Sequence, residues 1–263
     1  YNDNAEIIID DENVLKFTSK NDLKKIRGGK VSMIFQEPMA SFAPAIKIGN
    51  QMVEQLLLHK DLDKHKAKSI SIDMLNRVGI ADAEKRFNQY AFELSGGMRQ
   101  RAMIAMALST MPKLLLADEP TTALDVTIQA QVINLMKDII KEFNMGVIFI
   151  THDLGVIAQV ADDVAVMYLG SVVERGPVNE ILKNPKHPYT KGLLNALPDI
   201  NNLDAPLKPI PGNIPSPLER PTGCVFRTRC PNPTHDCKEG NIEMGLIEVE
   251  PGHWVDQCCV NCG

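Results

Sequence analysis

Two adjacent carboxylates, Asp118 and Glu119, directly follow the apolar stretch 114–117. Such a stretch is typical of a buried strand in a parallel sheet, and the carboxyl ends of parallel strands face the ligand crevice. Because successive strand residues point to opposite sides, the two acids can take different tasks. We expect Asp118 to hold Mg²⁺ and Glu119 to position and polarise an attacking water. For this pair taken alone, two solvated acids at a strand end are the alternative.

A second candidate site is a helix start, where Ser95, Gly96 and Gly97 open a helix that runs on through Met106. Backbone N–H groups at a helix N-terminus attract anions, and the Ser95 side chain adds a hydroxyl group. The motif therefore predicts a phosphate-binding helix start. On its own, it is equally compatible with an ordinary helix that contains glycine.

Polar side chains also end two further apolar stretches. Gln36 lies at the end of the stretch 31–35, where a neutral amide can reach a metal ion and an attacking water. His152 follows the stretch 146–150, where it can contact a terminal phosphate. Each of these residues taken alone would more often be structural. Their order along the chain, together with the acids and the glycine motif, indicates phosphate chemistry.

Apolar patterning predicts the elements that must position these side chains. Short apolar runs predict buried strands, and stripes with helical spacing predict amphipathic helices. Strands that alternate with helices imply a parallel α/β sheet. Strands are expected at 31–35, 114–117, 146–150 and 164–168, and helices at 21–26, within 48–106 and at 127–143. Prolines punctuate the chain after Gly176, so we expect one domain over 1–176 and a loop-rich domain over 177–263.

The composition excludes several classes of protein. The chain has 263 residues with 28 basic and 33 acidic side chains, so its formal charge is −5, which argues against nucleic-acid binding by bulk positive charge. Apolar residues are 44 % and charged residues 23 %, a balance typical of a soluble globular protein rather than a disordered one. No apolar stretch approaches the roughly 18 to 20 residues that would span a bilayer.

The six cysteines are confined to the last part of the chain, between Cys224 and Cys262. A secreted disulfide protein would usually spread its cysteines through the fold, so this clustering predicts a metal or cluster site. Four thiolates from loops can hold zinc or an iron–sulfur cluster. The expected ligands are Cys224, Cys230, Cys237 and Cys258, with Cys259 as a substitute for Cys258. Two alternatives remain open. One is a zinc knuckle that includes Cys259 and Cys262, and the other is a set of reduced thiols that bind no metal.

Taken together, these motifs resemble those of the ATP-binding subunits of ABC transporters. The matching pieces are the Q-loop at Gln36, the signature LSGGMRQR, the strand LLLADEP, the D-loop TALD and the switch histidine in ITHD. Longer pieces look like the branch that serves oligopeptide and dipeptide importers: IFQEPMASFAP, THDLGVIAQVADDVAVMYLG, NPKHPYTKGLL and IPGNIPSPLERPTGCVFRTRCP. The resemblance covers essentially the whole chain.

The resemblance implies a P-loop NTPase-like α/β core with an inserted helical subdomain, at about 38–100, and an irregular Cys-rich C-terminal domain. It implies an ATPase at the cytoplasmic face of the membrane. This ATPase would work with a second ATPase subunit, two transmembrane permease subunits and, indirectly, an extracellular peptide-binding protein. No nucleic acid is expected as a partner. ATP and Mg²⁺ would lie between two head-to-tail subunits. The similar Cys pattern in this branch looks like a [4Fe–4S] site.

The same resemblance implies a role for each candidate residue. Glu119 would act as general base or water-positioner, and His152 would contact the γ-phosphate. Gln36 would link the metal, the water and the membrane interface, beside Asp118 on Mg²⁺. The signature would cover the ATP held by the partner subunit, and Asp125 would lie at the dimer seam. The signature residues expected at the nucleotide are Ser95, Gly96, Gly97, Met98 and Gln100.

One family motif is missing from these 263 residues. A P-loop requires G-x-x-x-x-G-K-[ST], but the one Gly-Lys pair, Gly29-Lys30, is followed by Val31, and Lys24 stands where the first glycine is required. We expect the chain to be a fragment of a complete ATPase whose P-loop precedes Tyr1, because every other catalytic element is intact. The alternative is a non-catalytic subunit that lends only its signature to a partner. In either case the chain alone should bind ATP poorly at its own catalytic face and be inactive.

Two other functions remain as alternatives. Nickel import by a sister subunit is the nearest, and the Cys-rich tail disfavours it weakly. An ABC-type ATPase of DNA maintenance is disfavoured by the acidic balance, the short helical insert and the tail typical of peptide importers.

Overall fold

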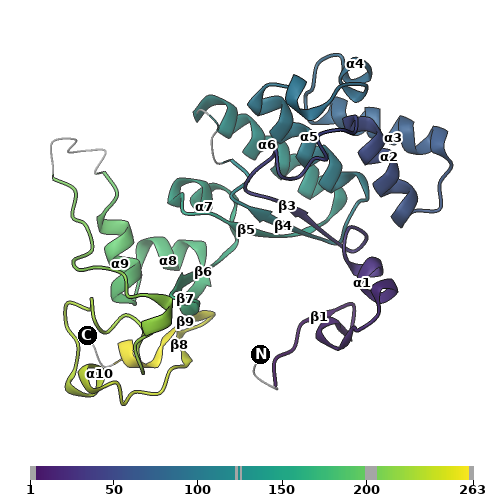
Figure 1. Ribbon diagram of the computed structural model, residues 1–263. Coiled ribbons are helices and arrows are strands. Elements are labelled where there is room, and N and C mark those ends of the chain that lie inside the picture. The colour runs from purple at the N-terminus through teal and green to yellow at the C-terminus, as the bar shows by residue number, and fades with distance from the viewer. Residues whose placement is uncertain (1–3, 122–123, 125, 199–205, 261–263) are drawn as a thin grey trace. The chain divides into compact units, whose positions relative to one another are not determined.

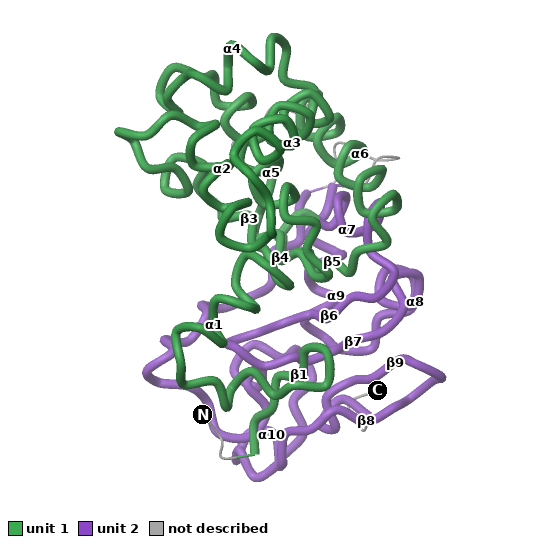
Figure 2. Tube along the Cα trace, turned by 90° about the vertical axis from the view of Figure 1, so that its right-hand side faces the viewer, with its two compact units in different colours: residues 1–153 green, residues 154–263 purple. Residues whose placement is uncertain are grey.

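The computed structural model describes the chain except for residues 1–3, 122–123, 125, 199–205 and 261–263. The described residues form two compact units, 1–153 and 154–263, which Figure 2 colours separately. We call them unit 1 and unit 2. This division comes before the hairpin at 163–177, whereas the boundary expected from the prolines follows it.

Unit 1 contains a three-stranded parallel sheet in the order β3-β4-β5 (Figure 1). The strands are β3 (Val31–Ile34), β4 (Leu114–Asp118) and β5 (Gly146–Ile150). The central strand β4 buries Leu115 and Ala117 completely, as its apolar sequence predicts. These three strands confirm the expected parallel α/β sheet.

The expectation that β5 would be a buried strand was wrong. Its residues alternate between exposed and half-buried, and Ile148 is 50 % exposed. Among the described strands β5 pairs only with β4, so one of its edges is unpaired. An apolar run predicts that a strand forms, but it does not show whether that strand lies at the centre or at the edge of the sheet.

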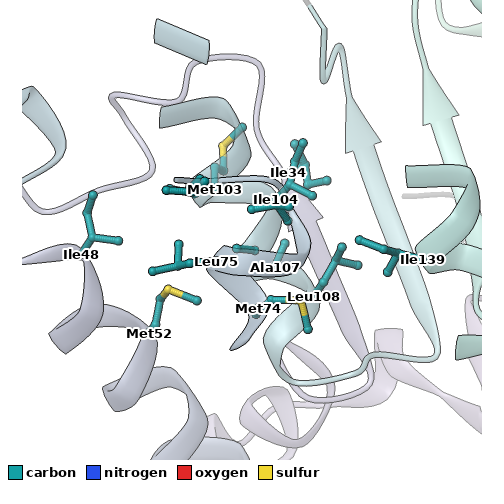
Figure 3. Close-up of a cluster of buried hydrophobic side chains, with 14 of the residues drawn as sticks. Ile34, Ile48, Met52, Met74, Leu75, Met103, Ile104, Ala107, Leu108 and Ile139 are labelled. Carbon is teal, nitrogen blue, oxygen red and sulfur yellow. The ribbon is translucent and has the colours of Figure 1, made fainter. Parts of the chain in front are cut away.

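The helices of unit 1 pack around α5 (Gly96–Ser109). The pair α2 (Ile48–His59) and α3 (Lys64–Arg77) contacts both α5 and the short helix α4 (Ala83–Phe87). Figure 3 shows the resulting core, in which side chains from these helices meet those of β3. The labelled members are Ile34, Ile48, Met52, Met74, Leu75, Met103, Ile104, Ala107, Leu108 and Ile139.

The long helix α6 (Val126–Phe143) confirms the predicted amphipathic helix. Among its buried residues, Val132, Met136 and Ile139 recur at spacings of four and three, which places them on one face. These side chains join the same core as α5, so α6 is fixed beside the sheet that carries the acids.

The N-terminal part of unit 1 is a two-stranded antiparallel hairpin, β1 (Ile8–Ile9) and β2 (Glu12–Asn13), followed by α1 (Lys20–Ile26). Ser19 caps α1 by accepting a hydrogen bond from the N–H of Asp22 at 3.1 Å. The predicted helix is thus confirmed, and Ser19 is its N-cap. Short 3-10 helices lie at Val14–Lys16 and Ala91–Glu93.

Unit 2 is built on a four-stranded antiparallel sheet in the order β6-β7-β9-β8. We expected residues 164–168 to be a further buried strand of the parallel sheet, and this was wrong. The strand β6 (Asp163–Tyr168) pairs antiparallel with β7 (Ser171–Pro177). The two residues between them, Leu169 and Gly170, both have positive φ, at 46° and 76°. Such a two-residue turn returns the chain beside the strand it has left, so the pairing must be antiparallel.

The rest of unit 2 is more regular than its proline content suggests. Three helices follow or precede the hairpin: α7 (Leu154–Val160), α8 (Val178–Lys183) and α9 (Pro188–Asn195). Further along lie the 3-10 helix Pro217–Glu219, α10 (His235–Glu239), β8 (Leu246–Glu250), β9 (His253–Asp256) and the 3-10 helix Gln257–Cys259. Within the described parts of both units, no helix has the length and apolar character needed to cross a membrane.

Candidate functional site

The carboxyl end of β4 carries Asp118 and Glu119 at a sharp change of backbone direction. Glu119 has φ 44°, a left-handed conformation that costs a non-glycine residue about 1 kcal/mol or more. Its N–H donates to the carbonyl of Ile150 at 2.9 Å, so β5 holds the backbone of Glu119 in place. Strain that neighbouring strands maintain is typical of functional positions.

The structure brings three of the predicted catalytic side chains together. Gln36 Nε2 donates to Glu119 Oε2 at 2.9 Å, and His152 Nδ1 lies 2.8 Å from Glu119 Oε1. The three residues follow β3, β4 and β5, so the sheet register aligns them at one edge. The Glu119 side chain is 21 % exposed and that of His152 is 78 % exposed, so the carboxylate is partly shielded while the imidazole reaches solvent.

This arrangement can bind and polarise a water molecule. The Glu119 carboxylate can accept a proton, and the Gln36 amide and the His152 imidazole contact its two oxygens. Asp118 is the last residue of β4 and is half-buried opposite Ile150. Its carboxylate is an oxygen ligand of the kind that Mg²⁺ prefers.

The signature motif forms the start of α5, as predicted. Ser95 is the N-cap, and its hydroxyl accepts a hydrogen bond from the N–H of Met98 at 3.3 Å. Ser95 and Gly96 are exposed, and a Cβ added at Gly96 would meet no described atom within 4 Å. The backbone at this helix start is therefore open to a ligand that carries negative charge.

Two predicted signature residues face inward instead. Gln100 is 1 % exposed, and its amide nitrogen donates to the carbonyl of Pro120. This hydrogen bond ties α5 to the loop that follows the acids. Met98 is half-buried and packs against the core of unit 1. The predicted D-loop residue Asp125 lies outside the described residues.

The cysteines form a second candidate site, in unit 2. Cys224, Cys237 and Cys258 are at most 4 % exposed and share one apolar cluster, against which Cys230 and Cys259 also pack. Cys224, Cys230, Cys237 and Cys259 are free thiols. The Cys258 and Cys259 sulfurs are 3.5 Å apart. The sixth, Cys262, lies outside the described residues.

Electrostatics support the proximity of the thiols. A hydrogen bond with Cys258 and burial raise the pKa of Cys224. Burial, with smaller contributions from Cys224 and Cys237, raises the pKa of Cys230. Cys224 and Cys258 are thus in contact, and Cys230 and Cys237 lie in or against the same apolar cluster.

A buried polar network beside the cysteines was missed by the sequence reasoning. Glu174 of β7 is fully buried and accepts hydrogen bonds from the backbone N–H groups of Lys186 and His187, at 2.6 and 3.1 Å. His253 Nε2 lies 2.8 Å from the same carboxylate. Burial lowers the pKa of His187 to about 4.

The sequence carried a signal for part of this network. His187 precedes Pro188, and Pro at the first position of a helix predicts that the preceding residue is the N-cap. Histidine is an unusual cap, which marks a side chain with a special environment.

Sequence comparisons give two family matches. The ABC transporter family matches residues 1–122, and the family described as "Oligopeptide/dipeptide transporter, C-terminal region" matches residues 173–237. The chain is 50 % identical over 233 residues to the oligopeptide transport ATP-binding protein AppD of Bacillus subtilis, covering 89 % of this chain and 71 % of AppD. It is 49 % identical over 233 residues to OppD of Salmonella typhimurium, covering 89 % and 69 %.

Structure comparisons find the same fold. The dimeric ABC transporter cassette MJ0796 aligns with a TM-score of 0.58 at 25 % identity, covering 66 % of this chain and 73 % of that one. The protein cbiO1 of Clostridium perfringens, described as part of the ABC transporter complex cbiONQ, aligns with a TM-score of 0.58 at 26 % identity, covering 67 % of each chain.

Proposed function

The chain belongs to the ATP-binding subunits of ABC transporters, in the oligopeptide and dipeptide branch, and on this premise we propose that the complete protein hydrolyses ATP to drive peptide import. The observation that carries the proposal is the contact of Gln36 and His152 with the two carboxylate oxygens of Glu119. We place the subunit at the cytoplasmic face of the membrane, peripherally attached to its permease.

In this proposal, Glu119 accepts the proton of the attacking water or orients that water towards the γ-phosphate. His152 contacts the γ-phosphate through its exposed ring, and Gln36 joins the metal and the water. Asp118 helps to hold Mg²⁺, which neutralises charge that develops on the phosphates.

The signature acts on the nucleotide of a second ATPase subunit in a head-to-tail dimer. The exposed residues Ser95 and Gly96 at the start of α5, followed by the half-buried Gly97, support this role. We keep Asp125 as a residue of the dimer seam, and Met98 and Gln100 as residues that shape the helix start from within.

The 263 residues contain no P-loop sequence, so we propose that they bind ATP poorly when tested alone. The second candidate, a subunit that completes only its partner's site, shares this behaviour. Under this second candidate, the full-length protein would also fail to hydrolyse ATP at its own catalytic site.

The helical segment between Pro38 and Leu94 is proposed to contact the permease. It carries a groove formed by α2, α3 and α4, where Val53, Leu57 and Phe87 lie beside the charged residues Glu54, Lys64 and Lys68. A groove with both apolar and charged lining suits a short amphipathic helix of a membrane subunit.

We propose that Cys224, Cys230, Cys237 and Cys258 hold a [4Fe–4S] cluster in the peptide-importer-type region, residues 177–263. The donor set supports this proposal, because the four sulfurs belong to or pack against one apolar cluster and are largely shielded from solvent. A cluster supplies cross-links between loops, and we assign it a structural role. Zinc bound by the same thiols is the alternative.

Reconstitution of the complete transporter in proteoliposomes tests the function. We expect ATP-dependent accumulation of labelled peptides and ATP hydrolysis that rises when peptide and its binding protein are supplied. Accumulation of Ni²⁺ without peptide would favour the nickel-importer alternative. Transport that continues when this subunit alone cannot hydrolyse ATP would favour the non-catalytic alternative.

A further inference from the structure

A buried histidine of unit 2 presents an unpartnered N–H group beside the cysteine site. His187 is 0 % exposed, and its Nδ1 accepts a hydrogen bond from the N–H of Tyr189 at 3.0 Å, which caps α9. A ring nitrogen that accepts must carry a lone pair, so the proton of the neutral ring is on Nε2. The fold of the helix start therefore dictates the tautomer of His187.

This Nε2–H group has no hydrogen-bond partner among the residues that the structure describes. A buried donor without a partner is destabilising and requires an explanation, such as a metal centre that forms there. A ring nitrogen of His187, the sulfur of Cys224 and a carboxylate oxygen of Asp256 all lie within 4.8 Å of one another. Because Nδ1 is occupied by Tyr189, Nε2 is the nitrogen available to these groups.

The position of His187 is fixed by a second set of hydrogen bonds. Both carboxylate oxygens of Glu174 accept from consecutive backbone N–H groups, those of Lys186 and His187. The imidazole also packs against Phe226, with ring centroids 5.6 Å apart. The backbone, the Nδ1 atom and the ring face of His187 are therefore all held by contacts, so the position of Nε2 is fixed.

We propose that the His187 Nε2–H group donates a hydrogen bond to the Cys224 thiolate when the cysteine site is loaded, so that His187 is a positioning residue for the cluster. This inference rests on the cluster of the proposed function. A thiol must lose its proton to bind metal, and the thiolate is a much stronger acceptor than the thiol. Loading of the site thus supplies the acceptor that the buried donor lacks.

Two other uses of His187 fit less well. A metal bond through Nε2 would need a proton on Nδ1, which would point at the N–H of Tyr189 and break the cap. Asp256 lies within 4.8 Å of the ring nitrogen, but no hydrogen bond joins them: Oδ1 of Asp256 accepts from the N–H of Gly245, and neither its Oδ2 nor His187 Nε2 has a partner among the described residues. The thiolate is the acceptor that appears only on loading.

A hydrogen-bond donor to a ligand thiolate stabilises the reduced, more negative form of a cluster, so it raises the reduction potential of the cluster.

Two substitutions of His187 separate its role as a donor at Nε2 from its role as the cap of α9. In His187→Asn, the amide oxygen lies near the position of Nδ1 and can accept from Tyr189, while the donor at Nε2 is lost. In His187→Gln, the amide nitrogen reaches the position of Nε2, while the cap acceptor is lost. Both variants lose the same ring contact with Phe226.

The experiment is a redox titration of the anaerobically isolated full-length protein, followed by electron paramagnetic resonance, with iron, sulfide and melting temperature measured on each variant. We expect the Asn variant to shift tenfold towards the oxidised form, which for a one-electron couple is a decrease of about 59 mV. We expect the Gln variant to keep the wild-type potential and to melt at a lower temperature.

The outcomes distinguish this inference from the cluster itself. Wild-type protein without iron and sulfide would overturn the cluster and the inference with it. Loaded wild-type protein and an Asn variant of unchanged potential would overturn only the role of His187, as would equal shifts in both variants. If the Asn variant does not bind a cluster, a Gln variant that binds one with the wild-type potential supports the donor role of His187. Failure of both variants to bind a cluster overturns that role.

Discussion

Gln36 Nε2 lies 2.9 Å from Glu119 Oε2, although the two residues are 83 positions apart in the chain. The contact exists because β3 and β4 are parallel neighbours that end at the same edge of the sheet. It links the segment that leads into the helical region with the carboxylate proposed to activate water. A displacement of that helical segment would therefore reach Glu119 directly through Gln36.

The histidine of this site provides the first prediction. His152→Ala removes the partner of Glu119 Oε1 and the contact proposed for the γ-phosphate, so ATP turnover by the full-length protein should fall about 10²-fold or more. Steady-state phosphate release measures this. The exposed residue His65 of α3 is the matched control, and His65→Ala should retain wild-type turnover. Equal activity of both variants would remove His152 from the mechanism.

The second prediction concerns the signature. Gly97→Ala places a methyl group 3.6 Å from Ile128, an ordinary contact, so the subunit should fold normally. Alanine in a helix is more favourable than glycine by roughly 0.5–1 kcal/mol, so thermal stability should stay the same or rise. ATP hydrolysis by the dimer should nevertheless fall, because the methyl group would lie against the partner's nucleotide. An unchanged rate would show that Gly97 does not approach ATP.

The cysteine doublet provides the third prediction. Cys258 is 4 % exposed and hydrogen-bonds with Cys224, whereas Cys259 is only half-buried. Cys258→Ser should abolish retention of iron and sulfide, and the neighbouring Cys259→Ser should preserve it. Metal analysis with the visible absorption spectrum measures both. Loss on Cys259→Ser alone would assign the fourth ligand to Cys259.

The fourth prediction concerns the core that supports the signature helix. Leu108 of α5 is 1 % exposed, and Leu108→Ala should lower the free energy of unfolding by about 2–5 kcal/mol through lost burial and a residual cavity. Leu58 of α2 is 49 % exposed, so Leu58→Ala should change this free energy by roughly 0.5 kcal/mol or less. Urea denaturation followed by circular dichroism distinguishes the two. Similar losses would contradict the packing of α5 described above.

The sequence predicted the parallel sheet and the catalytic edge because each candidate residue directly follows a short apolar run. Once β3, β4 and β5 are parallel, Gln36, Glu119 and His152 must meet at their carboxyl ends. The prediction for β6 failed because an apolar run carries no information on strand direction. The turn at Leu169 and Gly170 decides that direction, and it is a feature of φ angles rather than of hydrophobicity.

The network around Glu174 could not be predicted for a different reason. Glu174 and His187 are 13 positions apart, Asp256 is much further along the chain, and only the proline that follows His187 marks one of the three in the sequence. Only the antiparallel sheet of unit 2 and the cap of α9 bring them to the cysteines. Long-range polar contacts of this kind depend on the tertiary fold and leave no periodic signal in the sequence.

The most direct test of the central claim is ATP turnover by the full-length protein with Glu119→Gln. The amide keeps the shape of the side chain and removes its basicity, so ATP binding should remain close to that of the wild type while turnover falls by about 10²-fold to 10⁴-fold. The exposed residue Glu84 of α4 is the matched control, and Glu84→Gln should leave both quantities unchanged. Full turnover in Glu119→Gln would contradict the account of this chain as a catalytic ATPase subunit.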